Sequence, residues 1–152
     1  MMARAIPKTD PRRSRLLCVQ DDAESIALVE QLLASRKDLV LLRALDLEHG
    51  LKLARAKQPE AILVDIDLAG MGAIEFMKRL RNDAATEAAP ILALGANASP
   101  ATVVNAIDAG FFHYLAKPLQ AAPFLEALAY ALEFTAAERA ERGSPQPLKE
   151  SP

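Results

Sequence analysis

The chain is poor in the residues that covalent crosslinks and zinc sites require. Cys18 is the only cysteine among 152 residues, so no disulfide can form within the chain. The two histidines, His49 and His113, do not combine with Cys18 into a cluster of zinc-site spacing. Cys18 lies in a short apolar run, which favours a buried and unreactive thiol. The sequence therefore predicts neither a disulfide framework nor a structural zinc site.

An excess of positive charge and a long hydrophobic run are also missing. The net charge of −2 argues against a dedicated nucleic-acid binder, because phosphate contacts need a basic surface. The longest uncharged stretch, residues 88–107, is interrupted by two prolines and a glycine, so it does not predict a membrane span. The apolar run after Arg12-Arg13 has only four residues, too few for a secretory signal. We therefore expect a cytoplasmic protein without a nucleic-acid or membrane partner.

The remaining composition is that of one globular domain. Apolar residues make up 51% of the chain and charged residues 25%, and the length suffices for a single hydrophobic core. Residues 1–14 show no periodicity and predict a flexible arm. Residues 143–152 contain three prolines and predict a disordered tail. The interpretation is one domain over residues 15–142.

Within this domain, short apolar runs alternate with helical patterns. The predicted strands are residues 16–19, 39–42, 61–66, 90–94 and 111–116. Between and after them, apolar residues recur at helical spacing, namely Ile26, Val29, Leu32 and Leu33; Leu47, Leu51 and Ala54; Ile74, Met77 and Leu80; Val103, Val104 and Ile107; Phe124, Leu125, Leu128 and Leu132. Five strands alternating with five helices predict an α/β fold, a doubly wound five-stranded parallel sheet with helices on both faces.

Chemistry in such folds gathers beyond the carboxyl ends of the strands. Three carboxylates and one lysine end the predicted strands: Asp21, Asp22, Asp65 and Lys117. The adjacent carboxylates of Asp21 and Asp22 repel each other, which is costly unless one caps a helix or a cation lies between them. Both interpretations remain open at this point.

Four segments in order, VQDD, ILVDIDLAGMG, APILALGAN and AGFFHYLAKPL, resemble the receiver domain of two-component response regulators. The resemblance covers about residues 15–134. It implies the flavodoxin-like strand order 2-1-3-4-5, which places the first and third strands side by side. Asp21 and Asp65 would then meet.

The resemblance also implies a role for each residue of the constellation. Asp65 would be the phospho-acceptor, and Lys117 would pair with the transferred phosphoryl group. Magnesium would be held by Asp21, Asp65 and the backbone carbonyl of Asp67. Pro118 suggests a cis peptide bond in the turn after the lysine. The implied partners are a histidine kinase or phosphotransfer protein and an unidentified downstream protein, with no catalysis beyond the domain's own phosphoryl transfer.

Several positions depart from the family pattern. Gln20 stands where the family usually has its first acidic residue, and Gly95 stands where it usually has Thr or Ser. Ala69 replaces a common proline, a milder change. Tyr114 keeps the switch aromatic of the fifth strand, although its hydroxyl partner at position 95 is missing. Asp22 either caps the first helix or replaces the missing acid.

Two other functions and one surface stay open on the sequence alone. The first alternative is a pseudo-receiver, an interaction module that does not depend on phosphorylation. The second is a flavin or nucleotide binder, for which the loop from Gly70 is a weak signal because Glu75 replaces its third glycine. The last helix continues over residues 136–142, either as a solvated end or as a homodimer contact.

Overall fold

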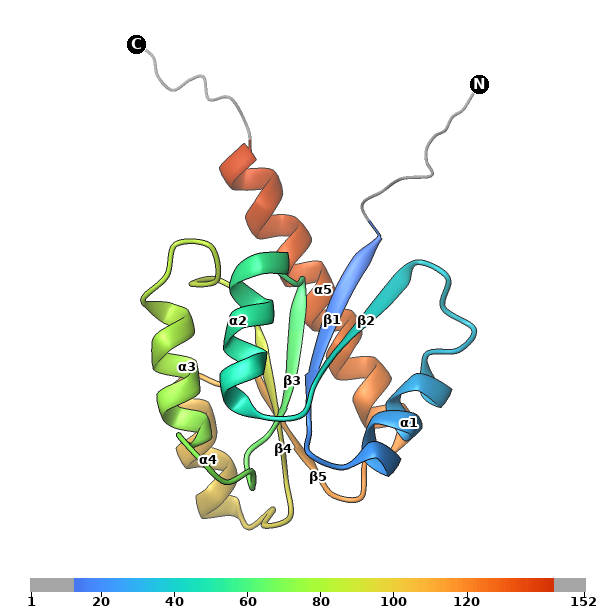
Figure 1. Cartoon of the computed structure of the whole chain (residues 1–152), viewed down its shortest axis with the longest axis vertical. Coiled ribbons are helices and arrows are strands. Elements are labelled where there is room, and N and C mark those ends of the chain that lie inside the picture. Colours follow the sequence, from blue (N-terminus) through green and yellow to red (C-terminus); the bar gives the residue numbers. More distant parts are fainter. Residues whose placement is uncertain (1–12, 144–152) are drawn as a thin grey trace.

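The computed structural model describes residues 13–143, where five strands alternate with five helices (Figure 1). Most of the predicted arm and tail, residues 1–12 and 144–152, lies outside this range. The elements in chain order are β1 (Ser14–Val19), α1 (Ala23–Leu32), β2 (Leu39–Ala44), α2 (Leu47–Lys57), β3 (Ala61–Asp65), α3 (Ala73–Arg81), β4 (Ile91–Gly95), α4 (Pro100–Ala109), β5 (His113–Ala116) and α5 (Ala121–Gly143).

All strand pairs are parallel, and the sheet order is β2-β1-β3-β4-β5. This confirms the predicted fold class. In the register, Leu16 lies opposite Ala61 and Val19 opposite Val64, so Gln20 follows β1 beside Asp65 at the end of β3. The buried stretches of the two central strands, Leu16–Val19 of β1 and Ala61–Val64 of β3, are entirely apolar, as expected where helices cover both faces of a sheet. The carboxyl ends of the strands therefore form one shared edge.

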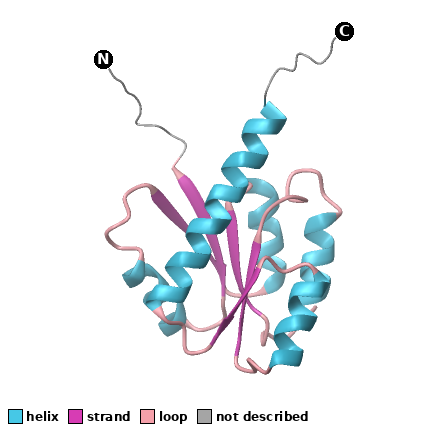
Figure 2. Cartoon of the chain, turned by 180° about the vertical axis from the view of Figure 1, so that it is seen from behind, coloured by secondary structure: helices cyan, strands magenta, loops and turns pink. Residues whose placement is uncertain are grey.

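The two sides of the sheet carry separate hydrophobic cores. Alternate residues of β1 point to opposite faces, so Leu17 and Val19 enter one core while Leu16 and Cys18 enter the other. The first core packs against α2, α3 and α4, with Phe76 at its centre. The second packs against α1 and α5, and Figure 2 shows α5 crossing the sheet on that face.

The fifth strand is shorter than predicted. It begins at His113, because the chain before it is used to close α4. Gly110 ends α4 with a φ of +121°, and the next amide, that of Phe111, donates to the carbonyl of Ala106 at 3.1 Å. This six-residue closure is a Schellman-type helix end, which needs a residue that tolerates positive φ. Phe111 is still buried, but in the turn rather than in the strand.

Part of the predicted apolar stripes faces solvent. On α4, Val104 is 55% exposed and Ile107 44%, and Ala106 is the one buried residue of this helix. The physical reason is position: α4 lies beside the edge strand β5, so there is no further strand for its outer residues to cover. On α3, Ile74 is also exposed, and Phe76 takes the buried position instead.

The extension of α5 contacts the amino-terminal edge of the sheet. Thr135 is buried, and its hydroxyl donates to the carbonyl of Glu60 at 2.6 Å. The Arg139 guanidinium pairs with the Glu60 carboxylate and donates to the carbonyl of Gln58 at 3.0 Å. The predicted helical extension is confirmed, and Arg139 attaches it to the sheet edge, while Ala136, Ala137, Ala140, Glu141 and Arg142 are exposed. Within the described range, no helix has the length and apolar character needed to cross a membrane.

Candidate functional site

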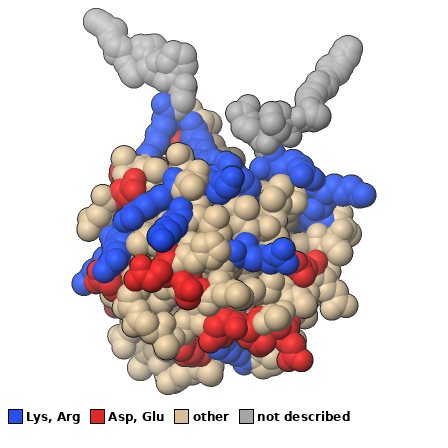
Figure 3. Space-filling view, viewed as in Figure 1, with Lys and Arg blue, Asp and Glu red and all other residues tan. Residues whose placement is uncertain are grey.

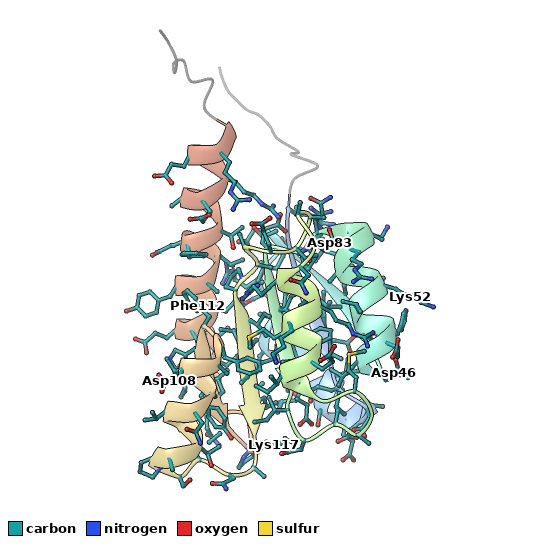
Figure 4. The ribbon with its side chains drawn as sticks, turned by 90° about the vertical axis from the view of Figure 1, so that its left-hand side faces the viewer. Asp46, Lys52, Asp83, Asp108, Phe112 and Lys117 are labelled. Atoms are coloured by element: carbon teal, nitrogen blue, oxygen red, sulfur yellow. The ribbon has the colours of Figure 1, made fainter. Side chains whose placement is uncertain are left out.

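Asp65 and Lys117 meet at the carboxyl edge of the sheet. Asp65 ends β3, and Lys117 follows β5 directly. The Lys117 ammonium lies 2.8 Å from Oδ2 of Asp65, whose side chain is almost completely buried. Figure 4 shows Lys117 at this edge, at the opposite end of the molecule from Asp83. The peptide bond between Lys117 and Pro118 is cis, as predicted. The structure therefore brings together the carboxylate of Asp65 and the ammonium group of Lys117, which the sequence placed at the ends of different strands.

The side chain of Asp67 is a third member of this group. Its Oδ2 accepts from the Lys117 ammonium at 3.0 Å and from the Ala96 amide at 3.0 Å. Its own amide donates to Oδ1 of Asp65 at 2.8 Å. The family resemblance implied only a backbone role for Asp67. Its position two residues after Asp65, in the turn that leaves β3, was the sequence feature that could have indicated a side-chain contact at the site.

The pKa values of this group reflect the mutual pairing. The hydrogen bond from Lys117 lowers the pKa of Asp67, and the Ala96 amide adds to this against the opposing effect of burial. Burial alone would lower the pKa of Lys117, but the hydrogen bonds to Asp65 and Asp67 outweigh it and the pKa is raised. Asp67 is therefore ionised and Lys117 protonated at neutral pH.

Gln20 fills the position beside Asp65 with a neutral side chain. It is only 1% exposed, and its Nε2 donates to the Cys18 sulfur at 3.0 Å. Its Oε1 is buried without a hydrogen-bond partner among the described residues. An unpartnered buried oxygen costs free energy, so this atom is a place where a cation or a bound water would be stabilising. Cys18 behind it is inert, because burial raises the pKa of its thiol to about 11.

Asp21 and Asp22 have different roles despite their adjacency. Asp22 is the N-cap of α1, as one interpretation predicted: its carboxylate accepts from the Glu24 amide at 3.0 Å and from the Ser25 hydroxyl at 2.9 Å. Both of its oxygens are thus engaged in the cap. Asp21 is exposed at the same edge. The cap therefore engages Asp22, while Asp21 lies outside it.

The donors at this edge suit magnesium in type. Among residues 13–143, no three His, Cys, Asp or Glu side chains are gathered as a metal cluster. Magnesium does not require one, since it usually takes one or two carboxylates and keeps several waters. The carboxylates of Asp21 and Asp65, the Asp67 carbonyl and the unpartnered Oε1 of Gln20 are all oxygen donors of the kind it prefers. The residues present therefore fit this ion. Because Gln20 is neutral, the site carries one negative charge fewer than it would with an acidic residue at position 20.

Gly95 and Tyr114 are in direct contact. Tyr114 is 8% exposed and points inward, and its hydroxyl donates to the carbonyl of Asn97 in the loop after β4. A Cβ atom on Gly95 would collide with this hydroxyl and would lie 2.9 Å from Cδ1 of Ile66. The missing side chain at position 95 is what allows Tyr114 to occupy this place. Burial, and then the charge of Asp67, raise the pKa of Tyr114.

A five-stranded parallel sheet of order 2-1-3-4-5 with an aspartate and a lysine at its carboxyl edge defines a receiver-type α/β domain. The model of the response regulator receiver domain matches residues 16–129, and the chain belongs to that family. It is 32% identical over 105 residues to the transcriptional regulatory protein AfsQ1 of Streptomyces coelicolor, covering 69% of this chain and 45% of that protein. The sensory/regulatory protein RpfC of Xanthomonas campestris is 30% identical over 119 residues, covering 77% of this chain and 16% of RpfC. The chain thus spans less than half the length of these curated relatives.

Solved structures agree with this family. The receiver domain of a sensor histidine kinase from Pseudomonas aeruginosa, with a magnesium ion coordinated in its active site cleft, is 26% identical with a TM-score of 0.70. The match covers 79% of this chain and 98% of that one. The chemotaxis protein CheY4 of Vibrio cholerae, at 24% identity and a TM-score of 0.71, covers 78% and 98% and shares the fold.

Proposed function

We propose that this domain accepts a phosphoryl group on Asp65 in two-component signalling and passes the signal on through protein contacts. The observation that carries the proposal is the 2.8 Å pair between the Lys117 ammonium and Oδ2 of the nearly buried Asp65. A lysine fixed beside a carboxylate is well placed to stabilise negative charge that develops on a group transferred to that carboxylate. Membership of the receiver family supports the same role.

The transfer uses a single oxygen of Asp65 as nucleophile. This oxygen attacks the phosphorus of a phosphohistidine, a P–O bond forms, and the P–N bond breaks. The leaving imidazole nitrogen keeps the bonding pair and takes a proton from water. Lys117 holds Asp65 in place and pairs with the phosphoryl oxygens, while Asp21, Asp65 and the Asp67 carbonyl would hold magnesium. The ion supplies charge neutralisation between two anions.

A histidine kinase or phosphotransfer protein is the donor that this chemistry requires. A cleft of about 370 Å³ opens beside the site between α1 and the turn after β5, and Gln20 and Lys117 contribute to its lining. The cleft is mostly apolar, which suits the side of a partner helix that delivers a histidine to Asp65.

The test is mass measurement of the intact protein after incubation with magnesium and acetyl phosphate. We expect the mass of one phosphoryl group to be added to the wild type and none to be added to Asp65→Asn. Asp46→Asn is the matched control, because Asp46 caps α2 and asparagine caps equally well. This control should be labelled like the wild type. Labelling of Asp65→Asn would show that the acceptor lies elsewhere.

A pseudo-receiver that binds its partner without phosphate is the second candidate. The observation that favours it is the inward Tyr114 held against Gly95, since no hydroxyl at position 95 can relay the arrival of a phosphoryl group. Absence of labelling in the wild type, together with an intact fold, would favour this second function.

A further inference from the structure

The carboxylate of Asp67 is bound by two donors from other parts of the chain. A single oxygen, Oδ2, accepts both from the Lys117 ammonium after β5 and from the Ala96 amide after β4. The side chain is nevertheless 46% exposed, so burial does not force it into this position. The donors hold it there.

One of these donors, the Lys117 ammonium, also contacts the Asp65 carboxylate. Lys117 contacts Oδ2 of Asp65 directly, and the Asp67 amide contacts Oδ1, so Asp65, Asp67 and Lys117 form one closed group. A phosphoryl group on Asp65 would add negative charge within this group and would draw on the donors around it. The Ala96 amide has only one hydrogen, so it can serve either Asp67 or a phosphoryl oxygen at full strength. Asp67 and a phosphoryl group would also repel each other as like charges.

We propose that Asp67 is a positioning residue. Before phosphorylation, its carboxylate accepts the hydrogen bonds from Lys117 and Ala96 that a phosphoryl group on Asp65 would otherwise accept. It draws the loop after β4 toward Lys117 in the unmodified protein and competes for those donors when Asp65 is modified. This inference rests on the proposed function and adds a regulator to the same site.

The loop after β4 is held by a second contact that agrees with this role. The Tyr114 hydroxyl donates to the Asn97 carbonyl, one residue beyond Ala96. Gly95 leaves the space that this hydroxyl occupies. The loop is therefore closed at two adjacent residues, 96 and 97, without any phosphoryl group. Phosphorylation of such a domain has to displace Asp67 rather than to close an open loop.

The experiment compares Asp67→Asn, which keeps the shape and removes the charge, with Asp67→Ala, which removes both acceptor oxygens. Asp108→Asn is the matched control, because Asp108 is an exposed residue near the carboxyl end of α4 and lies outside the group of Asp65, Asp67 and Lys117 (Figure 4). The first readout is hydrogen exchange of the Ala96 amide by NMR without phosphodonor. The second is the labelling rate with acetyl phosphate and magnesium, in which the Asp65 oxygen bonds to phosphorus and acetate leaves with the electron pair of the broken P–O bond.

We expect Asp67→Ala to raise the exchange rate of the Ala96 amide roughly tenfold or more, and Asp108→Asn to leave it unchanged. Asp67→Asn should be labelled about three to ten times faster than the wild type, because one competing charge is removed. A side chain with a merely structural role, or one that helps to hold the cation, would give slower labelling instead.

Two results would overturn the inference: unchanged Ala96 exchange in Asp67→Ala, or labelling of Asp67→Asn no faster than the wild type. If neither the wild type nor any variant is labelled, the proposed function is wrong independently of the role of Asp67. The exchange rate of the Ala96 amide then still decides whether Asp67 holds the loop.

Discussion

At the scale of single residues, the buried thiol of Cys18 makes the free energy of unfolding depend on pH. Burial raises the pKa of its thiol to about 11 from 9.0, so the folded protein favours the protonated form. This stabilisation is fully present below about pH 9 and is lost as the pH rises toward 11. We expect Cys18 to account for a loss of about 2–3 kcal/mol in the free energy of unfolding across that range.

Urea unfolding at both ends of this pH range measures that loss. Cys18→Ala should lose less stability than the wild type, although it starts lower because of the small cavity. The raised pKa values of Lys117 and Tyr114 account for the loss that remains in the variant. Equal losses in the two proteins would show that the thiol is not the group involved.

Gly95 and Tyr114 form a second residue-scale pair. We expect Gly95→Thr to push Tyr114 outward and break its hydrogen bond to the Asn97 carbonyl, at a cost of about 1–3 kcal/mol in unfolding free energy. The same substitution restores a hydroxyl at position 95. The structural response to phosphorylation, measured as NMR shifts around residue 114, should therefore become larger than in the wild type.

Tyr114→Phe provides the control for this contact. Without the Tyr hydroxyl, part of the collision disappears, so Gly95→Thr should cost less in the Tyr114→Phe background than alone. Additive costs would mean that the two residues do not press on each other. Large shifts around Tyr114 in the phosphorylated wild type would show that this domain signals without a side chain at position 95.

At the scale of elements, α5 is attached beyond its apolar stripe. Thr135 is buried, and its hydroxyl donates a hydrogen bond to the Glu60 carbonyl. We expect Thr135→Val to lower the free energy of unfolding by about 1–2 kcal/mol, because the substitution keeps the volume and leaves that carbonyl without this donor. Urea titration measures the change.

Arg142→Ala is the control on the same helix. Among residues 13–143, Arg142 pairs only with Glu138, at 3.6 Å, and it is largely exposed, so its removal should change stability by less than about 0.5 kcal/mol. Truncation after Phe134 should leave the domain folded but less stable than Thr135→Val, since it removes Arg139 as well. Loss of a dimer on truncation, seen by light scattering, would instead make the extension a contact between copies.

At the scale of the whole molecule, charge is distributed unevenly. On the face shown in Figure 3, basic side chains gather toward the amino-terminal edge of the sheet and acidic ones toward the carboxyl edge. The carboxyl edge is where Asp21 and Asp65 lie. A field of this sign attracts cations to the proposed magnesium site.

We expect magnesium to stabilise the whole domain, and Gln20→Glu to increase that effect. Without the ion, the variant should unfold at a lower temperature, because a charge replaces a side chain that is only 1% exposed. At one magnesium concentration, about ten times the Kd of the variant, binding should add about 1.4 kcal/mol to the stability of Gln20→Glu by mass action and less to that of the wild type, whose Kd is higher. Thermal unfolding with and without magnesium checks both. An equal magnesium shift in wild type and Gln20→Glu would place the ion away from position 20.

Much of the fold follows from local pattern. The five apolar runs predicted the strands because side chains buried on both faces of a parallel sheet must be apolar along the whole strand. The start of β5 and the outer faces of α3 and α4 could not be predicted in this way. Their burial depends on which strand lies at the edge of the sheet and on how Gly110 turns the chain, and neither is visible in local periodicity.

The sequence by itself determined the fold class, the family and the order of the chemical groups along the chain. Asp65 and Lys117 are 52 residues apart in that order, and only the parallel sheet brings them to 2.8 Å. The cap at Asp22 was one of two open interpretations until the folded chain placed its oxygens on Glu24 and Ser25. The double contact of Asp67 and the place of Tyr114 over Gly95 were decided by tertiary structure alone. Both depend on loops from different strands meeting at one edge, and the sequence of one segment contains no information about the position of another.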